Sequence, residues 1–383
     1  MISGKLVAAT VALAVATPLP TGWAGRTADC SPPRGTMSIG ESWAQRRLNL
    51  PEVWRLTRGS GVKVAIVDSG VDTTHPQLTK VRRRIDLTDT GAGDCVGHGT
   101  AVAGIIVGTE NRGVPFAGVA PEATLISIKQ TNEENGEVRL LAHGILRAVQ
   151  LGADVINVSV RAPDRPELKA VVAYALAQDV VVVAAAGNVT KDDGTSAPAY
   201  PAAYPGVLSV GAAGPDDARA ESSSTATPVS VLAPGVGVTS TSPGRAYREN
   251  LEGTSFAAPY VTGVVALVRA RHPALDQSAV RRRIRLTADG GAGTGTGAGM
   301  INPLLAVSAI LPSESVAIAP DEPVPLPAEA ILPAPVEDAR AVAIATWIAL
   351  VSTVAAILAV LVRVVIPLGR RRGWRPGRVG SGG

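Results

Sequence analysis

Five short apolar runs lie along the central part of this 383-residue chain, and most of them lack alternation between polar and apolar side chains. Strands that are buried on both faces read as continuous apolar runs, as in a parallel sheet covered by helices. The runs lie at residues 62–67, 124–128, 155–158, 180–185 and 207–210. Stretches with helical length or spacing separate them, at 99–107, 137–151, 166–177, 255–271 and 276–285. This alternation predicts an α/β fold with a mostly parallel sheet.

A shorter apolar stretch lies near the N-terminus. Lys5 precedes the run from Leu6 to Ala16, and small residues surround Ala24. This order is typical of a secretory signal peptide, which we place at residues 1–24. An N-terminal membrane anchor is the alternative, although the run is too short to span a bilayer.

A second long apolar stretch, residues 341–362, contains 22 residues and no charge. At about 1.5 Å per residue a helix of this length reaches about 33 Å, enough to cross the hydrocarbon core. Six arginines follow it in the tail 363–383, whereas the segment 312–340 before it carries six acidic residues and seven prolines. The positive-inside rule predicts a transmembrane helix with a cytoplasmic tail, an extracytoplasmic N-terminal part and a proline-stiffened linker at 312–340. A buried core helix is the alternative for 341–362.

Charge and cysteine content indicate which partners and which covalent bonds to expect. The formal net charge is only +4, less than the arginine-rich tail contributes alone. Nucleic acid is therefore not an expected partner, and anionic lipid at the inner leaflet accounts for the tail. Cys30 and Cys95 both lie in the part expected outside the cytoplasm, where a cysteine pair tends to be oxidised. A disulfide is predicted, with two free thiols as the alternative, and no metal site or cofactor is expected.

Three short motifs carry candidate chemistry. Asp68 ends the first apolar run, His98 lies between two glycines, and Ser255 opens a helical stretch after Gly-Thr. A serine needs an adjacent base to become a nucleophile at neutral pH, and the base needs a carboxylate to orient it. Taken singly, Asp68 could cap a turn and Ser255 could cap a helix. Together, in the order Asp, His, Ser, they predict a nucleophilic hydrolase.

Asn188 follows Ala184-Ala185-Ala186-Gly187 at the end of a predicted buried strand. Its side-chain amide could donate to an oxyanion, together with the backbone N–H of Ser255 at the helix start. A turn asparagine is the alternative for an isolated Gly-Asn pair. The remaining histidines, His75, His143 and His272, lack the glycine setting of His98 and are interpreted as structural or exposed.

The three motifs resemble those of the subtilisin-like serine proteases. They are Asp68-Ser69-Gly70, Gly97-His98-Gly99-Thr100 and Gly253-Thr254-Ser255-Phe256-Ala257-Ala258-Pro259. Gly118-Val119-Ala120-Pro121, Ala186-Gly187-Asn188 and Leu232-Ala233-Pro234-Gly235 also fit. The resemblance implies a three-layer subtilisin-like domain over residues 46–311 that cleaves polypeptides, with Asp68, His98 and Ser255 as the triad and Asn188 as the oxyanion donor.

The whole architecture resembles the mycosins, which are membrane-anchored subtilases of actinobacterial type VII secretion systems. A short N-terminal extension with a cysteine, here residues 25–45, a Pro-rich linker, one C-terminal helix and a basic tail are shared features. The resemblance implies that the extension wraps the domain, that Cys30 and Cys95 are bridged near His98, and that secretion membrane components are partners. A mainly structural subunit of that complex and a general cell-surface protease are the alternatives.

One segment departs from the family pattern. Related subtilases usually have a glycine where the chain pairs with substrate backbone, whereas this chain reads Asn157-Val158-Ser159-Val160-Arg161. We expect Ser159, Val160 and Arg161 to bind substrate. The Arg161 side chain either narrows the cleft or contacts an acidic group of the substrate, or else points to solvent.

Overall fold

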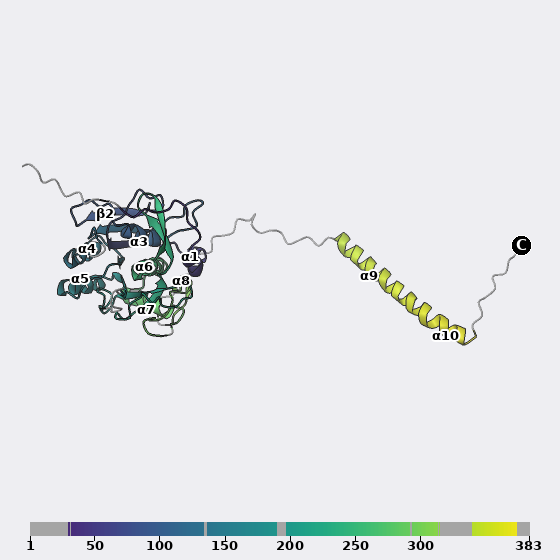
Figure 1. Cartoon of the computed structure of the whole chain (residues 1–383). Helices are drawn as coiled ribbons and strands as arrows, with labels where there is room; N and C mark the ends of the chain where they lie inside the picture. The colour runs from purple at the N-terminus through teal and green to yellow at the C-terminus, as the bar shows by residue number, and fades with distance from the viewer. Residues whose placement is uncertain are drawn as a thin grey trace, which may run out of the picture. The chain divides into compact units, whose positions relative to one another are not determined.

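The computed structural model describes residues 30, 32–133, 136–189, 197–291, 293–312, 314 and 339–373. It divides into two compact units, Met1–Ile318 and Ala319–Gly383 (Figure 1). The predicted signal peptide and most of the predicted linker lie outside the described residues. Each unit is considered by itself below.

The first unit is built on a seven-stranded sheet in which every neighbouring pair is parallel. Its strand order is β2-β3-β1-β4-β5-β6-β7. The bounds are β1 Lys63–Asp68, β2 Val81–Asp86, β3 Thr124–Lys129, β4 Val155–Val158, β5 Val181–Ala185, β6 Leu208–Ala213 and β7 Val231–Pro234. All five strands expected from the apolar runs are present, so the prediction of a mostly parallel sheet is confirmed.

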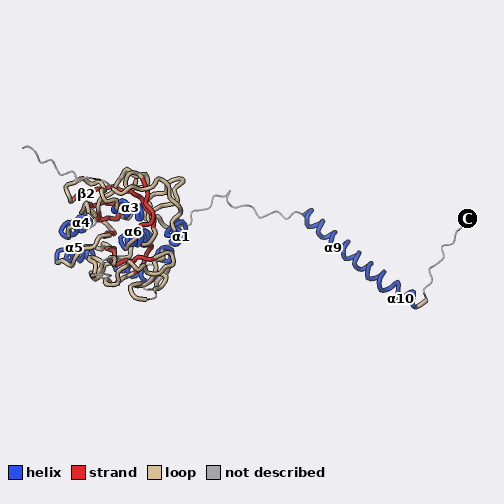
Figure 2. The backbone as a smooth tube through the Cα atoms, in the orientation of Figure 1, coloured by secondary structure: helices blue, strands red, loops and turns tan. Residues whose placement is uncertain are grey.

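Helices cover both faces of this sheet (Figure 2). The longer ones are α3 His98–Val107, α4 Val138–Gln150, α5 Pro166–Ala177, α6 Thr254–Arg271 and α7 Gln277–Leu286. Val64 and Ile66 of β1 pack in the core that contains α3 and α6, whereas Ala65 and Val67 pack in the core that contains α4 and α5. Successive residues of one strand thus enter opposite cores, which is why the apolar runs do not alternate.

Several elements were not predicted. The edge strand β2 contains three consecutive arginines and is largely exposed, so it lacks an apolar run. An antiparallel hairpin, β8 Val238–Ser242 and β9 Ala246–Leu251, is also missing from the prediction. Its first strand reads Val-Thr-Ser-Thr-Ser, and its buried hydroxyls bond to helix α3: Ser240 Oγ donates to the carbonyl of Ala101 at 2.6 Å and Thr241 Oγ1 to that of Thr100 at 2.8 Å. Hydrogen bonds between segments far apart in the sequence replace apolar contacts here, and a search for apolar runs cannot reveal them.

The N-terminal extension is tied to the domain at three places. Cys30 and Cys95 form the predicted disulfide. Thr36 and Tyr247 of β9 exchange two backbone hydrogen bonds of 2.8 Å. Helix α1, Trp43–Leu48, then buries Ala44 and Leu48 in the main core, and a second short helix, α2 Leu50–Trp54, follows it.

The C-terminal end of the first unit is held by a buried arginine. Arg283 of α7 donates to the carbonyls of Ala306 and Ala309 at the end of helix α8, Pro303–Ser308, and pairs with Glu314. The Arg283 side chain has no exposed surface and that of Glu314 is 8% exposed. This cluster of residues, Arg283, Ala306, Ala309 and Glu314, is called the Arg283 clamp below.

The second unit contains helix α9 Ala339–Val360, a π-helical turn Leu361–Val365 and helix α10 Ile366–Arg371. The stretch Val342–Arg371 has the length and composition of a membrane span, and its most apolar 18-residue window has a mean hydropathy of 2.6. None of its most apolar window is buried by protein. An exposed apolar helix of this length is a candidate transmembrane helix.

Loss of the disulfide should destabilise the first unit. The bridge closes a loop with a sequence separation of 65 residues. In the chain-entropy model such a loop stabilises the native state by about 4 kcal/mol. The full-length variant Cys30→Ser/Cys95→Ser, in detergent, should lose about that much unfolding free energy in a urea titration. Reduced wild-type protein should match the variant, and an unchanged urea midpoint in both would contradict the prediction.

A buried histidine should make stability depend on pH. His75 is buried; its Nδ1 accepts from the backbone N–H of Gln77 at 3.2 Å, so Nε2 carries the proton that is donated to the carbonyl of Ala246 at 3.1 Å. Burial is the main cause that lowers the pKa of His75 below 6.5. The unfolded chain therefore takes up the proton first, and unfolding free energy should be fully present above pH 6.5 and fall below it.

His272 behaves in the same way: it is buried against the carbonyl of Val307, and burial lowers its pKa below 6.5.

Urea titrations of wild type and His75→Phe at pH 8 and pH 5.5 measure how much unfolding free energy each protein loses on acidification. The variant should be less stable at pH 8 because it lacks both hydrogen bonds, yet lose less on acidification. An equal loss in both proteins would show that His75 does not contribute.

Candidate active site

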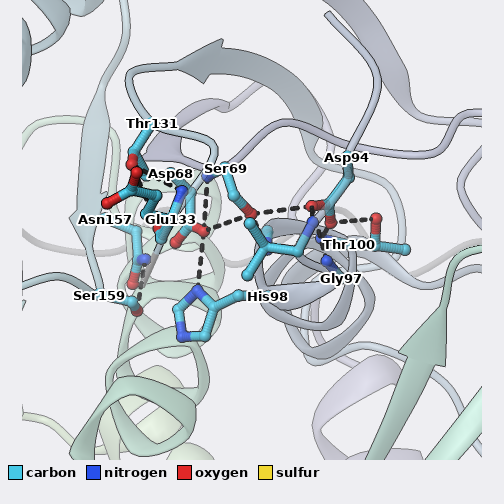
Figure 3. A network of polar contacts seen from close by, with 12 residues as sticks. Asp68, Ser69, Asp94, Gly97, His98, Thr100, Thr131, Glu133, Asn157 and Ser159 are labelled. Atoms are coloured by element: carbon cyan, nitrogen blue, oxygen red, sulfur yellow. Dashed lines mark hydrogen bonds and ion pairs between the residues drawn. The ribbon is translucent and has the colours of Figure 1, made fainter. Parts of the chain in front are cut away.

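Asp68 and His98 are brought together by the ends of two elements. Asp68 is the last residue of β1, and His98 is the first residue of α3. The Nδ1 atom of His98 lies 2.7 Å from Oδ1 of Asp68, which also accepts from the backbone N–H of Ser69 at 2.8 Å (Figure 3). The carboxylate is almost fully buried and can only accept, so Nδ1 donates and Nε2 is left as the basic nitrogen.

Ser255 lies in the first turn of α6, directly after Gly253 and Thr254. The helix supplies no acceptor for N–H groups in its first turn, so the N–H of Ser255 is available to a ligand. Gly253 has φ of 130°, where a side chain is disfavoured. A Cβ at Gly253 would lie 3.0 Å from Nδ2 of Asn188 and 3.6 Å from Oγ of Ser255, so glycine keeps the space between these two groups open.

The orientation of the Asn188 amide is set by Thr254. Oδ1 of Asn188 accepts from the backbone N–H and from the hydroxyl of Thr254, both at 3.0 Å. The Thr254 hydroxyl in turn accepts from the N–H of Gly187 at 3.1 Å. With Oδ1 engaged in this way, the Nδ2 group is the part of the amide that remains to donate. Asn188 thus presents an amide donor next to the first turn of α6, where Ser255 lies.

These side chains line one cleft of about 520 Å³. Its wall also includes the three residues predicted to bind substrate, Ser159, Val160 and Arg161. Ser159 and Val160 are buried, whereas Arg161 is exposed at the rim. The sequence prediction thus named seven residues for the site, and all seven line the same cleft.

The cleft wall is tied to helix α6. Asn157 donates from Nδ2 to Oγ of Ser159 at 2.9 Å, and Oδ1 of Asn157 accepts from the hydroxyl of Thr262 at 2.8 Å. Thr262 lies on the helix that begins beside Ser255. The same helix therefore fixes both the serine and the segment at residues 159–161.

Other lining residues were missed by sequence reasoning. Phe256 packs beside the imidazole of His98, with ring centroids 5.3 Å apart. Charged side chains at the wall come from two segments outside the motifs, Glu133 after β3 and Arg248 and Glu252 at β9 and its end, and give no local signal. Pro33 of the N-terminal extension also reaches the wall. Thr254 and Phe256 could have been predicted as site residues, because both lie inside the motif around Ser255.

Comparison with known proteins agrees with this geometry. The profile of the Subtilase family matches residues 59–301, well over half of the chain. Subtilisin E of Bacillus subtilis (strain 168) is 40% identical over 235 residues, which cover 60% of this chain and 61% of Subtilisin E. The chain therefore spans less than two thirds of that relative.

Two mycosins match over a larger share. Mycosin-4 of Mycobacterium tuberculosis (strain ATCC 25618 / H37Rv) is 37% identical over 330 residues, covering 73% of this chain and 72% of Mycosin-4. The structure of the MycP3 protease from the type VII (ESX-3) secretion system superposes with a TM-score of 0.64 and 33% identity, covering 72% of this chain and 92% of that protein. The strand order, the cleft and these matches lead to one conclusion: the chain belongs to the Subtilase family of serine endopeptidases.

Proposed function

We propose that this protein is a membrane-anchored serine endopeptidase of the mycosin type. The observation that carries the proposal is the 2.7 Å bond between Asp68 and His98 in a cleft that Ser255 and Asn188 also line. Ser, His and Asp in one cleft, with an amide donor beside the serine, are the groups that acyl transfer to water requires.

The reaction follows from the roles of these groups. Oγ of Ser255 attacks the scissile carbonyl, and its proton passes to Nε2 of His98. Asn188 Nδ2 and the Ser255 N–H donate to the oxygen that becomes negative. His98 then gives its proton to the leaving amine. Water next attacks the carbonyl of the acyl-enzyme while His98 takes its proton, and His98 returns that proton to Oγ of Ser255 as the acid product leaves. Asp68 keeps its charge throughout, holds the tautomer and stabilises the imidazolium.

The substrate is an extended polypeptide that lies along the segment Ser159, Val160 and Arg161. Ser159 is held by Asn157, so its position is defined before substrate arrives. Arg161 is exposed at the rim and has room to contact an acidic side chain of the substrate. The candidate span Val342–Arg371 would anchor the protein in the membrane, with the arginine tail in the cytoplasm and the cleft outside.

Association with a type VII secretion system is the proposed setting. It rests on the similarity to Mycosin-4 and to MycP3, a protease from a type VII secretion system, and on the extension bridged through Cys30 and Cys95. The proposed role is processing of proteins of that system while bound to its membrane components.

A fluorophosphonate probe tests the proposed chemistry, because it phosphonylates only an activated serine. The full-length protein in detergent should be labelled, and Ser255→Ala should not. Asn188→Ala should be labelled more slowly and should lose about 10²- to 10³-fold in kcat on a peptide, the magnitude measured in a related subtilisin. Equal labelling of wild type and Ser255→Ala would refute the role of Ser255.

Purification from native membranes tests the setting. The epitope-tagged chain, isolated in mild detergent, should carry type VII membrane components and should turn over generic peptides poorly. Ser255→Ala should retain the partners, since binding does not need the nucleophile. Exchange of residues 341–362 for an unrelated apolar span is the control for the membrane anchor itself. A preparation without such components that cleaves generic peptides rapidly would instead indicate a general surface protease.

A further inference from the structure

A second buried carboxylate lies close to the Asp68–His98 pair. Asp94 belongs to the loop between β2 and α3, and only 4% of the residue is exposed. Both of its oxygens are fully engaged, and five hydrogen bonds reach them. Oδ1 accepts from Ser69 Oγ at 2.9 Å, Val96 N at 3.0 Å and Gly97 N at 2.7 Å, and Oδ2 accepts from Thr100 N at 2.8 Å and Thr100 Oγ1 at 2.6 Å.

These bonds connect the two segments that carry the catalytic pair (Figure 3). On one side, Ser69 directly follows Asp68, and its hydroxyl also accepts from the N–H of Gly99 at 3.0 Å. On the other side, Thr100 lies in the first turn of α3, and its hydroxyl accepts from the N–H of Asp72 at 3.0 Å. Asp94 therefore joins the turn after β1 to the start of the helix that presents His98.

Asp94 also accepts hydrogen bonds from N–H groups at the start of helix α3, which the N-cap residue cannot do. The N-cap of α3 is Gly97, which has no side chain to accept from the first-turn N–H groups. The Asp94 carboxylate accepts from Gly97 and Thr100 instead, and places a negative charge at the positive end of the helix. The start of α3 is packed tightly against the turn after β1, because a Cβ at Gly99 would lie 2.1 Å from the carbonyl oxygen of Gly70.

We propose that Asp94 is a positioning residue for catalysis: it fixes the start of α3 against the turn after β1 so that His98 Nδ1 meets Asp68. The hydrogen bonds of Asp94 go to the backbone of residues 96, 97 and 100, to the Thr100 hydroxyl and to Ser69, so Asp94 acts on His98 through these groups. This inference rests on the proposed function of Asp68, His98 and Ser255.

Asp86, the last residue of β2, offers a matched control. It accepts four hydrogen bonds from the loop that follows β2. The donors are Thr88 N at 2.9 Å, Thr88 Oγ1 at 2.7 Å, Thr90 N at 2.9 Å and Gly91 N at 2.6 Å. Asp94→Asn and Asp86→Asn thus each remove one carboxylate charge that organises this loop, but only the first removes it from the link to the catalytic pair.

The test compares these two variants in the full-length protein in detergent. An asparagine at position 94 turns one acceptor into an NH₂ group that faces N–H or O–H donors, so the start of α3 must shift. We expect kcat on a peptide and the rate of fluorophosphonate labelling to fall about 10²-fold, with little change in KM, as for a displaced catalytic group. Asp86→Asn should keep wild-type kcat even where its unfolding free energy falls.

A proton spectrum gives a readout that does not depend on activity. The hydrogen-bonded Nδ1 proton of His98 resonates far downfield. Asp94→Asn should shift or broaden this resonance, whereas Asp86→Asn should leave it in place. Wild-type kcat and an unshifted resonance in Asp94→Asn would overturn the inference.

Two further outcomes have defined meanings. If Asp94→Asn does not fold, Thr100→Val decides, because it removes the hydroxyl that donates to Asp94 Oδ2 at 2.6 Å and must lower kcat and shift the resonance. Ser69→Ala is unsuitable, since the Ser69 hydroxyl also lies 3.3 Å from Oδ1 of Asp68. If wild-type protein is not labelled, the proposed function fails. In that case the resonance in Asp94→Asn still shows whether Asp94 holds His98 against Asp68.

Discussion

The bond between Asp68 and His98 constrains the rest of the first unit, because it joins two residues that belong to different layers of the fold. Asp68 ends a central strand, and His98 begins a helix that packs on one face of the sheet. A carboxylate at this depth is expensive to leave without donors, so the strand end and the helix start must be held together closely. The tight contact at Gly99 and the hydrogen bonds of Ser69 and Asp94 meet that requirement.

Helix α6 carries the other half of the site. Its first turn holds Ser255, and its third turn holds Asn157 through Thr262, which orients Ser159 in the cleft wall. Helix α6 therefore fixes the positions of both Ser255 and the segment at residues 159–161. That helix is buried along most of its length, including Ala258, Val261 and Val265, so a shift of one group without the other would disturb the core.

Much of the fold and the site could be read from the sequence, for two physical reasons. Strands covered on both faces leave continuous apolar runs, and the side chains that acyl transfer needs stand here in short motifs that contain glycine. Elements that have neither an apolar run nor a reactive side chain were not predicted. The edge strand β2 is arginine-rich, the hairpin β8–β9 buries hydroxyls, and Asp94 carries neither an apolar signal nor a reactive one.

The charges at the cleft wall could not be predicted either. Glu133 follows β3, Arg248 and Glu252 belong to β9 and its end, and only the folded chain brings them to the cleft that Arg161 also lines. Asp94 stands four residues before His98, and from there its side chain reaches forward to the N–H groups of Gly97 and Thr100 at the start of α3. A pattern of that kind gains meaning only once the helix start is known.

The Arg283 clamp has a mechanical consequence for a protein whose two units are joined by a linker. Glu314 is the last residue of the first unit that the structure describes, and a fully buried guanidinium holds it together with the carbonyls of Ala306 and Ala309. A charged group bonded to three partners in a site closed to solvent resists displacement more than a single surface contact does. A pull on the chain beyond Glu314 would act first on α7 and α8, which the clamp joins, and not directly on the strand and helix ends that hold Asp68, His98 and Ser255.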